Sequence, residues 1–356
     1  MRSLLLPIGW ESQWSLPKSG ISNINTITEG SVMILVTGGA GFIGSAIVAE
    51  LNARGVDDIF IVDILGKDQR WKNLRHLRYA DYMEADDFSQ MVSDSELEMD
   101  IDAVIHMGAC SDTTETDCSY LVKNNYEFSK LLAGWALDLE ARFIYASSAA
   151  TYGDGSQGFC DDEDLLETLR PLNMYGYSKQ MFDLWCRRQG LLDKFVGLKY
   201  FNVFGPNEYH KAEMRSFVIK AFEQINQTGS VKLFKSHRPD FPDGGQLRDF
   251  IYIKDAVDMT LFFLEHPDTA GIFNIGTGKA RNWNDLATAV FNAMGRPVSI
   301  EYIPMPEMLR DKYQYFTQAD ISKLRNAGYD NDTTPLEEAV SDYVKNYLMK
   351  GEYLGA

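Results

Sequence analysis

A glycine-rich segment directly after a short apolar run is the feature of this sequence that most restricts its fold. The run Met33–Val36 is apolar throughout, and the segment Thr37–Gly44 (Thr-Gly-Gly-Ala-Gly-Phe-Ile-Gly) contains glycines at positions 39, 41 and 44. Glycines at this spacing permit a tight turn between a strand and a helix, and they let a pyrophosphate approach the main chain at the helix N-terminus. Asp63 lies about 20 residues beyond the last glycine, where an acidic residue normally binds the adenosine ribose. A dinucleotide site is therefore predicted, and a glycine-rich turn without a ligand is the alternative.

The first 200 residues alternate short apolar runs with helical patterns. We expect strands at 33–36, 59–63, 103–107 and 142–147, and helices from Phe42, near 86–97 and over 120–139. Continuous apolar strands separated by helices are typical of a parallel sheet that is covered on both faces. The sequence therefore predicts an α/β protein with a Rossmann-type doubly wound parallel sheet.

The pattern becomes less regular after about residue 200, where loops with Pro and Gly separate amphipathic segments at 214–226, 254–266, 282–294 and 334–348. We interpret these as a smaller, discontinuous α/β substrate domain. Residues 1–32 show no sustained periodicity and are expected to form an extension outside the fold. The predicted division gives residues 33–199, 251–279 and 315–330 to the dinucleotide-binding domain, and residues 200–250, 280–314 and 331–356 to the substrate-binding domain.

The composition narrows the possible functions. The chain has 34 Lys and Arg against 51 Asp and Glu, a net charge of −17. An acidic surface repels a phosphate backbone, so nucleic acid is not an expected partner. No apolar run approaches the roughly 18–20 residues that a membrane-spanning helix needs. The four cysteines show no Cys-x-x-Cys spacing and the five histidines form no close pair, which predicts a cytoplasmic protein with reduced thiols and no protein-bound metal.

A second group of residues suggests acid/base chemistry. Tyr175 and Lys179 are four apart at the start of a helical run, so they share one helix face. A cation at that distance favours the phenolate and is expected to lower the tyrosine pKa from about 10 toward neutral pH. Ser147 or Ser148, at the end of an upstream strand, is expected to bind the same substrate oxygen. Tyr/Lys pairs are common on helix surfaces, and this one is informative because it accompanies the glycine motif.

Together these motifs resemble the extended short-chain dehydrogenase/reductase superfamily over nearly all of residues 33–350. Within that superfamily, several further segments resemble the ADP-L-glycero-D-manno-heptose 6-epimerases: Gly108–Glu115, Asn124–Tyr126, Tyr200–Lys211, Leu247–Tyr252, Phe273–Gly278 and Tyr313–Asp320. The first and third of these distinguish the heptose epimerases from sugar-nucleotide 4-epimerases and dehydratases.

The resemblance implies an isomerase that acts on an ADP-heptose used for the lipopolysaccharide inner core. In that family, bound NADP oxidises the sugar at its sixth carbon, the resulting ketone presents its other face, and the same cofactor returns the hydride. In the family the two acid/base groups correspond to Tyr175 and Lys211, with Ser148 and Lys179 in support. Lys211 has alternatives as a diphosphate contact or a surface residue. The family also forms homo-oligomers, reportedly pentamers.

By the same matching, two sets of residues are expected to line the ligands. The cofactor set is Gly38, Gly41, Phe42, Ile43, Gly44, Asp63, Arg70, Met107, Gly108, Ala109, Cys110, Ser111, Asn124 and Lys179. The substrate set is Ser148, Asn202, Val203, Glu213, Lys220, Phe234, Arg248 and Tyr313. Arg248 has a physical argument of its own, since a guanidinium group suits a diphosphate and an acidic protein needs a local cation. A buried Arg248–Asp249 ion pair is the alternative.

Several positions depart from the family pattern. Ala85 stands where some members have a lysine near the 2′-phosphate of NADP, and the Asp63 carboxylate by itself favours the 2′-hydroxyl of NAD, so NAD remains a possible cofactor. Lys67, Arg70 and Lys72 could neutralise a 2′-phosphate or form a solvated loop. Glu213 and Lys220 replace small or neutral residues on the substrate side, and the segment 237–246 is longer than usual. These changes bear on the identity of the sugar more than on the reaction type. Another sugar-nucleotide epimerase or a 4,6-dehydratase is the second hypothesis, although a dehydratase usually has an acidic pair beside the strand-end serine and the residues after Ser148 offer none. A non-catalytic dinucleotide-sensing protein is the third possibility, and the intact Ser148, Tyr175 and Lys179 set disfavours it.

Overall fold

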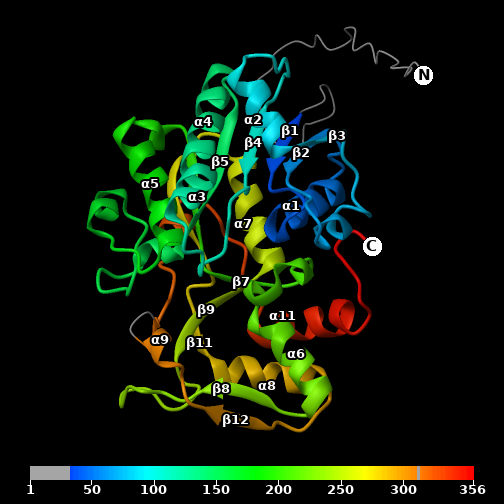
Figure 1. The fold of residues 1–356 in the computed structure, drawn as a ribbon, viewed down its shortest axis with the longest axis vertical. Helices are drawn as coiled ribbons and strands as arrows, with labels where there is room; N and C mark the ends of the chain where they lie inside the picture. The colour runs from blue at the N-terminus through cyan, green and yellow to red at the C-terminus, as the bar shows by residue number, and fades with distance from the viewer. Residues whose placement is uncertain (1–32, 311–312) are drawn as a thin grey trace, which may run out of the picture.

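A seven-stranded parallel sheet forms the centre of the computed structural model, which describes residues 33–310 and 313–356 (Figure 1). The strands lie in the order β3 (Asp81–Glu84), β2 (Ile59–Asp63), β1 (Ile34–Thr37), β4 (Ala103–His106), β5 (Arg142–Ser148), β6 (Val196–Tyr200) and β10 (Gly271–Ile275). The chain order reverses between β1 and β4, where ligands bind in doubly wound sheets. The predicted fold class is confirmed.

Helices cover both faces of this sheet. Alternate residues of each strand enter two apolar cores because successive side chains of a strand point to opposite faces. In β1, Val36 belongs to one core and Leu35 to the other. The first core includes α1 (Phe42–Ala53) and α7 (Ile253–Glu265). The second includes α2 (Ala85–Ser93), α4 (Phe128–Asp138) and α5 (Met174–Arg188).

A second layer lies beyond the carboxyl ends of the large sheet, in the lower half of Figure 1. It contains a three-stranded sheet, β11 (Ala280–Asn282), β9 (Leu247–Tyr252) and β7 (Asn202–Phe204), and a parallel pair, β12 (Ile300–Ile303) and β8 (Val231–Phe234). Its helices are α6 (Phe217–Thr228), α8 (Trp283–Ala293), α9 (Glu307–Arg310) and α11 (Leu336–Asp342). The residue ranges assigned to the two domains remain a prediction.

Short helical segments connect these elements. Two of them, η3 (Val122–Glu127) and η8 (Tyr343–Leu348), are π-helical. The others are η2 (Arg70–Asn73), α3 (Cys118–Leu121), η4 (Ala149–Tyr152), η5 (Glu163–Thr168), η6 (Leu191–Asp193), η7 (Tyr209–Met214) and α10 (Ser322–Asn326). The helix expected over 120–139 is thus a succession of α3, η3 and α4. The expected extension, residues 1–32, lies outside the described residues.

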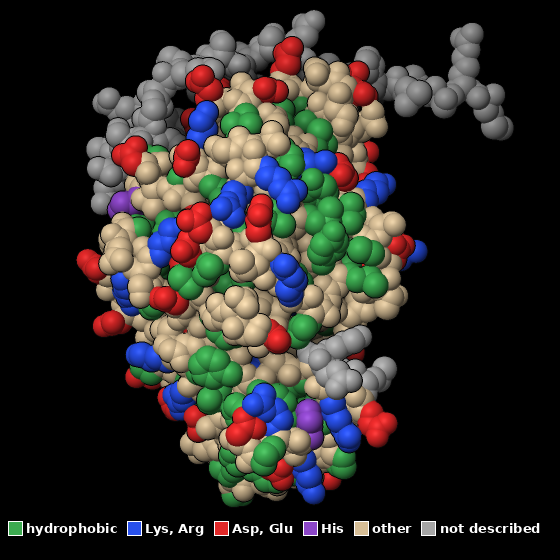
Figure 2. Space-filling model, turned by 90° about the vertical axis from the view of Figure 1, so that its left-hand side faces the viewer, with side chains coloured by type: hydrophobic (Ala, Val, Ile, Leu, Met, Phe, Trp, Pro, Cys, Tyr) green, Lys and Arg blue, Asp and Glu red, His purple; other side chains and the backbone are tan. Residues whose placement is uncertain are grey.

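The surface mixes charges of both signs. On the face shown in Figure 2, Lys and Arg side chains are interspersed with Asp and Glu. Within residues 33–310 and 313–356, no helix has both the length and the apolar character needed to cross a membrane.

Candidate active site

The glycine turn between β1 and α1 leaves no room for side chains. Gly38 has a φ of +66°, and a Cβ atom there would lie 2.7 Å from the main-chain nitrogen of Gly108. A Cβ atom on Gly44 would lie 2.1 Å from the Gly38 carbonyl oxygen. Glycine is therefore required at both positions for steric reasons. The turn lies against the segment after β4, since Gly38 approaches the main chain of Met107 and Gly108. Main-chain nitrogens at a helix N-terminus that follows such a turn can bind a pyrophosphate.

Asp63, at the end of β2, binds this turn. One of its carboxylate oxygens accepts hydrogen bonds from the main-chain nitrogens of Ala40 (2.8 Å) and Gly41 (3.1 Å). Burial raises the pKa of Asp63, and these hydrogen bonds and the Arg70 guanidinium oppose that rise. Arg70 lies 3.5 Å from the other Asp63 oxygen and also pairs with Asp68 at 2.8 Å. The predicted acidic residue and the predicted cation are therefore neighbours.

The segment after β4 holds the next predicted cofactor residues, Met107 to Ser111. The Gly108 nitrogen donates to the Thr37 hydroxyl at 3.1 Å. Asn125, which is fully buried, accepts from the Cys110 nitrogen at 2.8 Å and donates to the Cys110 carbonyl at 2.9 Å. The side chain of its neighbour Asn124, the predicted cofactor residue, instead donates to the Tyr120 carbonyl at 2.7 Å. Asn125 was missed because only the fold brings it beside Cys110.

Tyr175 and Lys179 lie on the first turns of α5, which Asn173 caps by accepting a hydrogen bond from the Gly176 nitrogen. Lys179 is buried and donates to the Ala146 carbonyl in β5 at 2.9 Å. Burial lowers the pKa of Lys179 to about 8. The helix face predicted from the four-residue spacing thus packs along the end of β5, where Ser148 is found.

The expected effect of Lys179 on the Tyr175 pKa is wrong for this arrangement. Burial raises the pKa of Tyr175, and a hydrogen bond with the Ser148 side chain is what opposes that rise. The Lys179 ammonium group instead donates a hydrogen bond to the main-chain carbonyl of Ala146. Desolvation therefore outweighs the cation in setting the protonation of this phenol, which favours its protonated form.

Lys211 reaches the glycine turn from a distant part of the sequence. It lies on η7, and its ammonium nitrogen is 5.2 Å from the centre of the Phe42 ring at the start of α1. Burial lowers the pKa of Lys211, and the carboxylate of Glu208 opposes that change. A lysine in this position can lose its proton more readily than one in water.

The loop that carries Lys211 is held by buried polar contacts. Glu208 accepts hydrogen bonds from the main-chain nitrogen and the hydroxyl of Ser216. Asn207 donates to the Ser45 hydroxyl of α1 at 3.0 Å and accepts from the Leu354 nitrogen at 2.9 Å. The loop also contains a strained residue, Ala212, with a φ of 45°. Strained conformations persist only when the surrounding structure fixes them.

Arg248, on β9, is a buried cation. Its guanidinium group donates to the carbonyls of Leu247 and Gln314, and it lies 5.1 Å from the centre of the Tyr313 ring and 5.9 Å from that of Trp283. Burial lowers its pKa. No carboxylate among residues 33–310 and 313–356 forms an ion pair with it. Within the described part of the chain this guanidinium group is therefore buried without a carboxylate partner, an arrangement that is suited to bind an anion.

The alternative of an Arg248–Asp249 ion pair is wrong. Asp249 points to the opposite side of β9, as neighbouring residues of a strand do. Its carboxylate accepts hydrogen bonds from the Thr277 hydroxyl and from the main-chain nitrogens of Thr277, Gly278 and Ala319.

Known proteins similar in sequence to this chain identify its family. Residues 34–276 match the model of the NAD dependent epimerase/dehydratase family. A curated protein of Nitratidesulfovibrio vulgaris, named ADP-L-glycero-D-manno-heptose-6-epimerase, is 57% identical over 320 residues, which is 90% of this chain and 99% of the relative. The chain belongs to the ADP-L-glycero-D-manno-heptose 6-epimerase family. A Fusobacterium nucleatum relative with the same name is 49% identical over 327 residues, 89% of this chain and 98% of its own.

Solved structures support the same assignment. The crystal structure of the Helicobacter pylori ADP-L-glycero-D-manno-heptose-6-epimerase matches with a TM-score of 0.72 and 26% identity, over 89% of this chain and 96% of that one. The UDP-glucose 4-epimerase of Thermotoga maritima matches with a TM-score of 0.73 and 26% identity, over 90% and 100%. The fold is thus common to heptose 6-epimerases and sugar 4-epimerases. The family assignment within this fold therefore rests on the 57% and 49% sequence identity to heptose 6-epimerases.

The remaining substrate-side residues predicted for a heptose 6-epimerase lie in the second layer. Asn202 and Val203 belong to β7, which pairs with the strand of Arg248, and Phe234 ends β8. The two unusual residues, Glu213 and Lys220, pair with each other at 3.4 Å. The two charged side chains that depart from the family pattern therefore partly neutralise each other.

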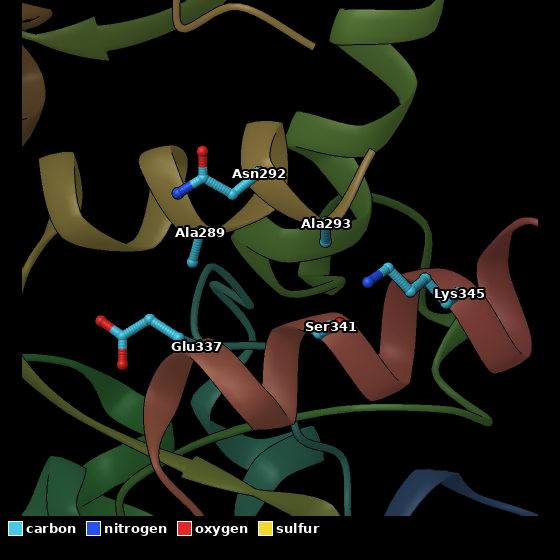
Figure 3. Close-up of a pocket in the computed structure, with 6 residues that line it drawn as sticks. All are labelled: Ala289, Asn292, Ala293, Glu337, Ser341 and Lys345. Atoms are coloured by element: carbon cyan, nitrogen blue, oxygen red, sulfur yellow. The ribbon is translucent and has the colours of Figure 1, made fainter. Parts of the chain in front are cut away.

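A hollow between α8 and α11 is separate from the predicted cofactor and substrate residues. It is lined by Ala289, Asn292, Ala293, Glu337, Ser341 and Lys345 (Figure 3). None of the predicted site residues lines it. Throughout the described ranges, no group of three or more His, Cys, Asp or Glu side chains is arranged to hold a metal ion.

Proposed function

We propose that this protein inverts the sixth carbon of ADP-D-glycero-D-manno-heptose to give ADP-L-glycero-D-manno-heptose, for lipopolysaccharide core synthesis. The observation that carries the proposal is that two groups able to transfer protons lie at the same edge of the sheet, where strands β5 and β1 end. Tyr175 lies beside Ser148 at the end of β5, and Lys211 lies over Phe42 at the start of α1. The names of the relatives, at 57% and 49% identity, support this substrate.

A nicotinamide dinucleotide is the cofactor that the family match and the NAD complexes of similar structures support. The turn from Gly38 to Gly44 would hold its pyrophosphate, because a side chain at either glycine would occupy the space beside the main chain. When bound, the nicotinamide would remove a hydride from the sugar carbon and return it to the other face. Arg70 beside Asp63 supports NADP, since a guanidinium group can bind a 2′-phosphate.

Two acid/base groups suit an inversion because the proton of the sugar hydroxyl is handled on both faces of the carbon. In our proposal one group takes this proton as the ketone forms, and the other supplies a proton as the hydroxyl returns. Burial moves Tyr175 toward the protonated acid and Lys211 toward the neutral base. Ser148 would bind the reacting oxygen beside the phenol. Arg248 would bind the diphosphate and neutralise its charge.

The decisive experiment is to incubate the purified protein with ADP-D-glycero-D-manno-heptose and to follow the epimer without added cofactor. Tyr175→Phe is expected to lower the rate by more than about a hundredfold, and Lys211→Ala to abolish epimerisation while the dinucleotide stays bound. No conversion by protein that retains its dinucleotide would refute the proposed activity. Normal turnover of Tyr175→Phe would remove the phenol from the mechanism.

Mass analysis of the small molecules released on denaturation distinguishes the closest alternatives. NADP together with an ADP-sugar would agree with our proposal. A UDP- or dTDP-sugar would instead identify a 4-epimerase or a dehydratase. The same preparation, analysed by light scattering, tests the homo-oligomer that we propose from the family resemblance, and cell fractionation tests a cytoplasmic location.

A further inference from the structure

A buried ion pair joins α5, the helix that carries Tyr175, to strand β6. Asp183 of α5 and Lys199 of β6 are both fully buried, and the ammonium nitrogen is 2.7 Å from a carboxylate oxygen. Such pairs cost much desolvation energy, and replacing them with apolar residues is often neutral or stabilising. Net stability therefore does not explain this pair, and its contacts suggest another role.

The contacts of the pair lie on both sides of Ser148. The Asp183 carboxylate accepts hydrogen bonds from the Ser147 hydroxyl at 2.7 Å and the Tyr145 hydroxyl at 3.0 Å. The Lys199 ammonium donates to the Thr151 hydroxyl at 2.7 Å. Thr151 in turn donates to the main-chain carbonyl of Ser148 at 2.8 Å. The chain around Ser148 is thus fixed before and after that residue.

The same pair fixes the helix that carries Tyr175. Tyr175, Lys179 and Asp183 follow one another at intervals of four residues, so they lie along one face of α5. Lys179 donates to the Ala146 carbonyl and Asp183 accepts from Tyr145 and Ser147, all in β5. These bonds fix the position of α5 along the strand, and with it the position of the Tyr175 phenol relative to the Ser148 hydroxyl.

We propose that Asp183, Lys199 and Thr151 are positioning residues that hold the Ser148 hydroxyl and the Tyr175 phenol in one geometry for proton transfer. The inference rests on the proposed function, because it assumes that Ser148 and Tyr175 act on the substrate. Proton transfer depends steeply on distance, and a displacement of about 1 Å can cost about a hundredfold in rate. None of the three residues needs to touch the substrate.

The test uses Thr151→Val, which keeps the shape of the side chain and removes both hydroxyl contacts. We expect kcat with ADP-D-glycero-D-manno-heptose to fall by about tenfold or more, with KM within about twofold. Thr151→Ser, which keeps the hydroxyl, should restore kcat. Thr260→Val is the matched control, because that threonine is also fully buried and its hydroxyl contacts the Ala256 carbonyl and the Tyr200 hydroxyl. It lies on α7, on the opposite face of the sheet, and should leave kcat unchanged.

A double-mutant cycle separates positioning from general stability. If Thr151 acts through Ser148, Thr151→Val should change kcat by less than about twofold when Ser148→Ala is already present. A purely structural role predicts a lower melting temperature and an unchanged kcat in the folded protein, and that result would overturn the inference. Equal effects in both backgrounds would overturn it as well.

Ser147→Ala keeps the test possible should Thr151→Val fail to fold, since it removes a single hydroxyl from the Asp183 side of the network. It is expected to lower kcat in the same way, and unchanged kcat in this variant would count against the inference. The outcomes also separate this inference from the proposed function. If Ser148→Ala and Tyr175→Phe keep full activity, the roles assigned to Ser148 and Tyr175 in the proposed function are refuted. If those two variants are impaired while Thr151→Val and Ser147→Ala stay fully active, only the positioning role is refuted.

Discussion

Replacing Arg248 with methionine should weaken substrate binding without unfolding the protein. Arg248 is 6% exposed, and its guanidinium group has two main-chain carbonyls and two aromatic rings around it. A hydrogen bond to a charged group contributes about 1.5–3 kcal/mol. Loss of such a bond to the diphosphate corresponds to a rise of about 10- to 150-fold in KM.

The stability of the same variant should change little. Arg248→Met loses the bonds to the carbonyls of Leu247 and Gln314 and its contacts with the rings of Tyr313 and Trp283. It also removes a buried charge that lowers the stability of the fold, and methionine can pack against the same rings. We expect the free energy of unfolding to stay within about 1 kcal/mol of the parent protein or to rise, because residues at binding sites are often stabilised by replacement.

Arg142→Met is the matched control. Arg142 begins β5 at the opposite end of the strand from Ser148, and burial lowers its pKa to about 10. Its guanidinium group donates to the carbonyls of Lys194, Phe263, His266 and Thr269. This variant should unfold more easily, because four carbonyls lose their donor where Arg248→Met affects two, and it should keep a normal KM. Urea unfolding and initial rates over a range of ADP-heptose concentrations measure both quantities. A normal KM with a large loss of stability in Arg248→Met would refute the reasoning.

Three further predictions concern the cofactor side and the core. Gly44→Ala should destabilise the protein by about 1–3 kcal/mol and release the dinucleotide, because the new Cβ atom would meet main-chain atoms. In the control Gly134→Ala the new Cβ atom has no neighbour within 4 Å, so this variant should stabilise the protein by about 0.5–1 kcal/mol. Thermal unfolding of the two variants tests both expectations. Burial lowers the pKa of His106 to about 3 in the folded protein. As the pH drops, the imidazole therefore binds a proton in the unfolded chain before it does so in the folded protein, and the free energy of unfolding should fall between pH 6.5 and pH 3. The same decline in urea titrations of His106→Asn would contradict this. Arg70→Ala should weaken NADP more than NAD in a binding titration, and equal losses would contradict a 2′-phosphate contact.

The apolar pattern of the sequence was sufficient to predict the sheet but not every strand. Strands β1, β2, β4 and β5 are continuous apolar runs or nearly so. The pattern in β6 is interrupted by Gly197 and by Lys199, whose charge is matched by Asp183 from a helix. The edge strand β3 is partly exposed and polar. These two strands and β10 were not predicted. Packing and pairing across the fold, more than local composition, make the residues of β3 and β6 strands.

The candidate site was predictable where its residues are close in sequence. The glycine turn and the Tyr175–Lys179 pair could be found by spacing alone. Lys211 required the family resemblance, since no local pattern links it to Phe42, about 170 residues earlier. Asn125 and Glu208 were missed because their partners are chosen by the fold. The pKa of Tyr175 was predicted with the wrong sign, because spacing identifies a nearby cation and does not measure burial.

The contact between Asn207 and Leu354 has a consequence for how the protein is made. Strands β1 to β6 come from residues 34–200 and can pair while the rest of the chain is still being synthesised, since folding during translation proceeds from the N-terminal side. Near the C-terminus, the Leu354 nitrogen donates to Asn207 of the Lys211 loop, and the Tyr209 hydroxyl of the same loop donates to the Glu352 carbonyl. The chain ends near α1 in Figure 1. A nascent chain can therefore form its dinucleotide turn, and the contacts of the Lys211 loop with Ser45 and Ser216, before its C-terminal residues are made. The loop gains its full set of contacts only when residues 352–354 have left the ribosome.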